Sequence, residues 1–129
     1  MTSRRSALLA LLADVVLVVV FTAIGRATHD GDVLGEGGSG LLMTAWPFVT
    51  GLLAGWAVSR GWRRPLALLR TGLVVWGLTL VVGMLLRAVS GQGVAVAFVI
   101  VAAVTLLVFL VGWRVIVGLI ARARLTRSA

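Results

Sequence analysis

Long apolar runs separated by short polar segments make up most of this chain. The runs cover residues 7–25, 41–58, 66–87 and 94–120. A helix needs about 20 apolar residues to cross the hydrocarbon core of a bilayer, and each run is close to that length or longer. The pattern therefore predicts an all-α integral membrane protein, with residues 1–129 forming a single four-helix transmembrane bundle.

Two of the runs need a further argument. If Pro47 opened the second helix, only about 12 apolar residues would remain, so we place it in an early turn, where its missing N–H costs little. The fourth run is roughly 40 Å long as a helix, longer than the hydrocarbon core. The fourth helix must tilt, or it must leave the membrane after Trp113 and Arg114. In the second case, residues 115–121 form a surface-lying or protruding helical end.

Composition points to lipid as the main solvent. Hydrophobic residues make up 60% of the chain and charged residues 12%, against roughly a quarter in soluble domains. The net charge of +8 does not indicate a nucleic-acid partner, because the arginines stand at the ends of the apolar runs and form no polar stripe. The interior Asp14 and the length of the first run favour a retained helix over a cleaved signal peptide.

Few side chains are suited to covalent or metal chemistry. The chain has no Cys and one His, which leaves no cysteine or histidine cluster for a metal. Scattered threonines offer no convincing pair of nucleophile and base. We expect no metal and no cofactor, and an enzyme is the least supported class of function.

The arginines predict an orientation. Eight lie at the amino end, in the segment between the second and third runs, and at the carboxyl end, while Arg26 and Arg87 flank the other two connections. Cytoplasmic loops carry the excess of basic residues, so both termini of this multi-pass cell-membrane protein should be cytoplasmic.

Asp14 is the main chemical anomaly, because it lies inside the first apolar run. An unpaired carboxylate in hydrocarbon costs about 2.5–3.5 kcal/mol, so it should be neutralised or paired. Arg70 and Arg114 enter the same half of the membrane from the third and fourth runs. We expect Asp14 to pair with one of them, and Arg114 matches its depth better; in the alternative, both arginines only reach the inner headgroups.

A second polar group is predicted at the outer surface. Arg26, His29, Trp46 and Arg87 stand where the first three helices emerge. Two interpretations stay open: a solvated loop with headgroup contacts, or a site for an anion or a lipid headgroup in which His29 changes charge near neutral pH.

Glycines mark the faces where helices can approach closely. The candidates for helix packing are Gly51, Gly55, Gly72, Gly83 and Gly112. Such faces leave open an oligomer or a membrane-protein partner, in addition to the lipid bilayer. Gly112 and Arg114 are about 200° apart on a helical wheel, so one neighbouring helix cannot meet both.

Several short motifs together resemble a known family. They are Asp14, Phe21, Gly25-Arg26, His29, Thr44-Ala45-Trp46-Pro47-Phe48, Gly51, Gly55-Trp56, Trp76, Gly83, Arg87 and Gly112-Trp113-Arg114. In order and spacing they resemble the bacterial and archaeal membrane family called domain of unknown function 3054. The resemblance implies a four-helix integral membrane protein and no particular activity.

Two functions follow as hypotheses. The first is a structural or interaction subunit of the membrane. The alternative is a small transporter or a lipid- or anion-handling protein with Asp14 as an intramembrane proton or cation site. A water-accessible cavity at Asp14 would favour the alternative, whereas a dry, packed bundle would favour the first.

Overall fold

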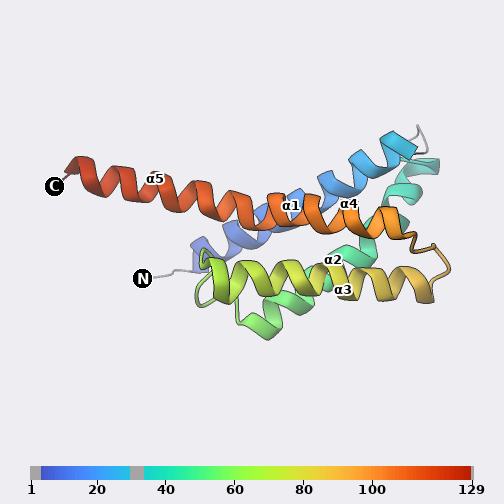
Figure 1. Cartoon of the computed structure of the whole chain (residues 1–129), viewed down its shortest axis with the longest axis horizontal. Coiled ribbons are helices and arrows are strands. Elements are labelled where there is room, and N and C mark those ends of the chain that lie inside the picture. Colours follow the sequence, from blue (N-terminus) through green and yellow to red (C-terminus); the bar gives the residue numbers. More distant parts are fainter. Residues whose placement is uncertain (1–3, 30–33, 129) are drawn as a thin grey trace.

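The computed structural model describes residues 4–29 and 34–128, and all the regular structure in these residues is helical (Figure 1). The helices are α1 (Arg4–His29), α2 (Ser39–Ser59), α3 (Leu73–Val89), α4 (Val96–Leu106) and α5 (Gly112–Ser128). A 3₁₀ turn, η1 (Glu36–Gly38), precedes α2, and two π-helical segments, η2 (Leu68–Gly72) and η3 (Leu107–Val111), lead into α3 and α5.

Four helical stretches are long and apolar enough to cross a membrane. They are Arg4–Ala27, Ser39–Ser59, Leu68–Val89 and Val96–Arg127. The prediction of an all-helical chain with four helices of this kind is confirmed. The first, second and fourth stretches extend beyond their apolar runs at polar ends, whereas the third and fourth begin two residues after their runs, at Leu68 and Val96.

In Figure 1, α3 and the rod of α4 and α5 lie roughly along the long axis, and α1 and α2 run obliquely to them. The α2–α3 connection lies at the same end as the start of α1, and the α3–α4 connection lies at the opposite end. α4, η3 and α5 follow one another as a single rod, and the carboxyl-terminal part of α5 extends past the other helices (Figure 1).

Glycines allow α2 and α3 to approach closely. A Cβ atom added at Gly51 would lie 2.8 Å from the carbonyl oxygen of Leu78, and one at Gly55 would lie 2.8 Å from Cα of Val75. Gly83 of α3 lies against the ring of Phe48 in the same way. These faces of α2 and α3 are therefore filled within one chain.

Gly112, unlike the other candidate packing glycines, has no close neighbour within the described part of this chain. Nothing among the described residues lies within 4 Å of a Cβ built on it. Arg114, two residues further on, turns into the bundle, so Gly112 faces outward, as the wheel argument requires of one of the two.

The interior is narrow and partly aromatic. α1 buries one stripe at intervals of three and four residues: Ala10, Asp14, Val18, Phe21 and Thr22. Near the end of this stripe, the ring of Phe21 lies 5.3 Å from that of Phe48 and 6.4 Å from that of Phe98, centroid to centroid. Outward positions of the same helix, such as Leu12 and Val16, stay exposed and apolar, which suits a lipid environment.

Pro47 lies inside α2, eight positions after its first residue, so the prediction of an early turn is wrong. A residue with an N–H at this position would donate to the carbonyl of Met43, one turn earlier. Nε2 of Gln92, from the α3–α4 connection, donates to that carbonyl oxygen at 2.9 Å. A side chain far along the sequence thus replaces the missing backbone donor and lets the helix begin earlier.

Candidate functional site: a buried ion pair between α1 and α5

Asp14 and Arg114 form a bidentate ion pair in the interior. Nη2 of Arg114 lies 2.6 Å from Oδ2 of Asp14, and Nη1 lies 2.9 Å from Oδ1. Both side chains have no solvent exposure. The two parallel bonds use the planar fork of the guanidinium group, a geometry that a lysine cannot reproduce.

Two tryptophans complete the carboxylate's hydrogen bonds. Nε1 of Trp56 donates to Oδ2 of Asp14 at 2.8 Å, and Nε1 of Trp113 donates to Oδ1, also at 2.8 Å. Each carboxylate oxygen thus accepts two bonds, which fills its lone-pair directions. Burial of the charge is offset by donors from α2 and α5 as well as by the arginine.

Arg114 is held equally firmly from its own side. Its Nε donates to the carbonyl of Pro65 at 2.7 Å, and Nη1 donates to the carbonyl of Leu110 at 2.7 Å. Leu110 belongs to the π-helical segment η3, directly before α5. Such segments add a residue to a turn and re-aim the side chains that follow them, which here brings Trp113 and Arg114 to the same carboxylate.

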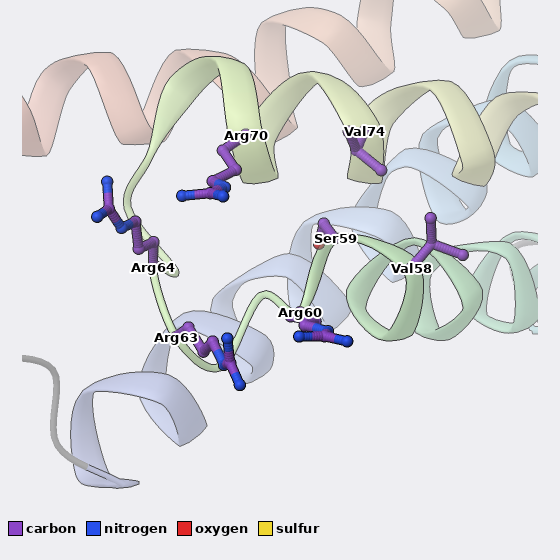
Figure 2. A pocket seen from close by; sticks show the side chains of 7 residues that line it. All are labelled: Val58, Ser59, Arg60, Arg63, Arg64, Arg70 and Val74. Carbon is purple, nitrogen blue, oxygen red and sulfur yellow. The ribbon is translucent and has the colours of Figure 1, made fainter.

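Arg70, the other candidate partner of Asp14, does not join this pair. It is exposed and lines a different pocket, beside Arg60, Arg63 and Arg64 (Figure 2). The reason is the π-helical turn of η2, which buries the next two residues, Thr71 and Gly72, and places Gly72 against the Arg114 side chain. Arg70 is then turned away from the interior.

The ion pair also fixes the α2–α3 connection. Trp56, one of the donors to Asp14, covers Gly61 with its ring, and a Cβ there would lie 2.7 Å from that ring. Pro65, whose carbonyl binds Arg114, lies near the other end of the connection. Next to it, the hydroxyl of Thr71 donates to the carbonyl of Arg64 at 2.6 Å. Both ends of the connection therefore depend on the buried pair.

At the far end of the bundle, the structure brings Arg26 and Arg87 to one pocket of about 500 Å³, together with Thr44, Gln92 and Phe98. Both guanidinium groups already have partners within the chain. Nη1 of Arg26 donates to the hydroxyl of Thr44 at 3.3 Å, and Nη2 of Arg87 donates to the carbonyl of Gln92 at 3.2 Å. Cζ of Arg87 lies 4.5 Å from the centroid of the Phe98 ring.

Of the other two members of the predicted outer site, only the Trp46 side chain is described. Trp46 does not line the pocket, because Thr44 and Phe48 face it from α2 and a residue two positions from each points to the opposite side. It is exposed instead. His29 ends α1, and its side chain lies outside the part of the structure that is described, as does Asp30.

Sequence reasoning missed Trp56 and Trp113 as partners of the carboxylate. Tryptophan is common at membrane interfaces, so its type alone did not distinguish a donor to Asp14 from an interfacial anchor. The available signal was the need of a buried carboxylate for donors at its own depth, which indole N–H groups can meet. The Pro65 carbonyl could not be foreseen, since every residue carries one.

This arrangement of four apolar helices, tied by an acid on the first and an arginine on the last, defines a class of small all-helical protein whose helices are long and apolar enough to cross a membrane. The family model described as "Protein of unknown function (DUF3054)" matches residues 11–117, and the chain belongs to this family. The match includes Asp14, Trp56, Trp113 and Arg114. No curated protein matches the chain, and no solved structure does either.

Proposed function

We propose that this chain is a four-span integral membrane protein that serves as a structural or interaction subunit of the cell membrane, with both termini in the cytoplasm. One observation carries the proposal: the acidic residue inside the bundle is buried, paired and saturated with hydrogen bonds. Asp14 lines neither of the two pockets described in the molecule. A group so enclosed is suited to holding helices together.

The same observation speaks against the alternative of a transporter centred on Asp14. A proton or cation site must exchange with water on each side in turn, and intramembrane acids with that role face a water-filled cavity. Here the carboxylate faces two indoles and a guanidinium group.

Proton flux separates the two functions. The wild-type chain is reconstituted in liposomes with a pH-sensitive dye inside, and a potassium diffusion potential is applied. A structural subunit gives the same flux as protein-free liposomes. A faster flux in the wild type, returned to the protein-free rate in a folded Asp14→Asn variant, would overturn the proposal.

The charge distribution supports the orientation. Arg4, Arg5, the arginines of the α2–α3 connection and those of the α5 end lie at one end of the bundle, and Arg26 and Arg87 lie toward the other. Because the chain has no cysteine, single-cysteine variants report position cleanly. In intact cells, a membrane-impermeant maleimide should label Ser90→Cys and leave Thr126→Cys unlabelled until the cells are opened. The reverse pattern contradicts the orientation.

An interaction subunit should also be found in an assembly. One chain has a mass of 13.5 kDa. In a mild detergent, light scattering corrected for the micelle should give a protein mass above that value. A homogeneous monomer at micromolar concentration contradicts the interaction role and leaves a self-contained structural one.

A further inference from the structure

Four arginines surround a single pocket at the end of the bundle where the α2–α3 connection lies. The pocket has a volume of about 580 Å³ and is lined by Val58, Ser59, Arg60, Arg63, Arg64, Arg70 and Val74. Figure 2 shows the four guanidinium groups around the opening between the connection and the first turns of the third span, with Val58 and Val74 further along the two helices. Arg60 follows the end of α2, Arg63 and Arg64 belong to the connection, and Arg70 comes from η2.

Within residues 4–29 and 34–128, none of the four arginines of this pocket forms an ion pair. The four acids of the sequence are Asp14, Asp30, Asp32 and Glu36. Asp14 forms an ion pair with Arg114, and the other three acids belong in sequence to the α1–α2 connection. Four positive charges gathered at one pocket repel one another, and an anion bound between them would remove that repulsion.

The backbone that carries the arginines is held in place. α2 ends with Arg60 in the left-handed conformation, at φ 53°, while the N–H of Arg60 donates to Ala57 and that of Gly61 donates to Trp56. Glycine is the usual residue at such a position, because a Cβ is strained there. Beyond it, the carbonyls of Arg64 and Pro65 are fixed by Thr71 and Arg114. A fixed backbone lowers the entropy cost of gathering guanidinium groups on one ligand.

We propose that this pocket binds a phosphate group, and that its source is the headgroup of an anionic membrane lipid. Guanidinium groups bind phosphate oxygens in pairs of hydrogen bonds, and several arginines at one point are typical of phosphate recognition. The lipid source follows from the valines: Val58 is 69% exposed on the outer side of α2, so the pocket continues into an apolar face suited to acyl chains. This inference goes beyond the structural role, and its failure would leave the ion pair and the orientation untouched.

Three probes identify the ligand. The purified chain in a neutral, non-ionic detergent is titrated with dihexanoyl phosphatidylglycerol, dihexanoyl phosphatidylcholine and inorganic phosphate, and binding is measured by native mass spectrometry. We expect phosphatidylglycerol to bind about tenfold or more tightly than phosphatidylcholine, with an affinity that falls as salt rises. Stronger binding of inorganic phosphate than of phosphatidylglycerol would keep the phosphate site and replace its source with a soluble anion. Equal binding of all three probes overturns the proposal.

A matched pair of variants separates the pocket from general positive charge. The pocket variant is Arg60→Gln with Arg63→Gln and Arg70→Gln, and the control is Arg122→Gln with Arg124→Gln and Arg127→Gln in the exposed end of α5. Both remove three charges from the same end of the bundle. The pocket variant should lose the preference for phosphatidylglycerol, and the control should keep it within about twofold. Equal losses in both overturn the proposal.

The Arg60→Gly variant tests whether a loss of lipid binding could be caused by misfolding. Glycine removes the strain of the left-handed position together with one guanidinium group. The variant should unfold at a temperature no lower than that of the wild type and still bind phosphatidylglycerol several-fold more weakly. A stable Arg60→Gly variant with wild-type affinity would remove Arg60 from the site.

Discussion

The guanidinium group of Arg114 and the carboxylate of Asp14, a hundred residues apart in sequence, meet through two parallel hydrogen bonds of 2.6 and 2.9 Å. This pair links α1 to α5, and its donors and acceptors extend to α2 through Trp56 and to the α2–α3 connection through Pro65. Much of the bundle is therefore organised around one acid and one base, and removing either should destabilise the packing of all the helices that they connect.

Loss of one charge of the pair should destabilise the bundle strongly. Asp14→Asn leaves Arg114 buried without a counterion, and Arg114→Gln leaves the carboxylate in the same state. Breaking a buried pair from one side costs about 3–5 kcal/mol. We expect each variant to lower the free energy of unfolding by about that amount, measured by denaturation in mixed micelles with increasing sodium dodecyl sulfate.

The double variant Asp14→Asn with Arg114→Gln is the control for coupling. Because neither residue then carries an uncompensated charge, the two losses should not add, and the double variant should be more stable than the sum by about 1–3 kcal/mol. Strict additivity would mean that the two residues do not act as a pair.

Each indole N–H on Asp14 should contribute separately. Trp56→Phe and Trp113→Phe keep a large ring and remove one hydrogen bond to a charged, buried acceptor, which costs about 1–3 kcal/mol. Trp62→Phe is the matched control, since Trp62 is 51% exposed, and its effect should stay within about 0.5 kcal/mol. The measurement is the same unfolding titration, and equal effects of all three variants would show that ring size, and not the N–H, matters.

The sequence predicts the main architecture because its strongest signal is also its simplest physical constraint. An apolar run long enough to cross a bilayer must be helical in lipid, since no water is available for its backbone groups. The pairing of Asp14 with Arg114 could be anticipated for a similar reason: a buried carboxylate needs a cation at its own depth, and few are present.

Other features depend on local geometry that no periodic pattern carries. Arg70 and Arg114 both stay candidates in the sequence, which does not show that the π-helical segment η2 turns Arg70 away from the interior. Pro47 was placed near a helix start, because sequence alone does not show that Gln92 would donate to the carbonyl of Met43. Both features arise where a side chain or an irregular turn replaces a standard backbone hydrogen bond.

Gln92 and Pro47 should be coupled through that carbonyl. Gln92→Ala removes the donor to Met43, and a net loss of about 0.5–1.5 kcal/mol is expected. In a Pro47→Ala background, the restored N–H at position 47 can donate to the same carbonyl, so the cost of Gln92→Ala should fall. A double-mutant cycle on unfolding free energies measures the difference, and an equal cost in both backgrounds would contradict the exchange of donors.

Close packing between α2 and α3 should make two glycines sensitive and a third tolerant. Gly51→Ala would place a methyl group 2.8 Å from the carbonyl oxygen of Leu78, and Gly83→Ala would place one 2.6 Å from the Phe48 ring, so something must shift in each case. Overpacking of this kind costs about 1–3 kcal/mol. Gly77→Ala, also in α3, meets no described atom within 4 Å and should be neutral or stabilising by up to about 1 kcal/mol through helix propensity. Unfolding titrations of the three variants compare the losses in the free energy of unfolding directly. If Gly77→Ala were as unstable as Gly51→Ala, the loss would not be caused by overpacking at the α2–α3 contact.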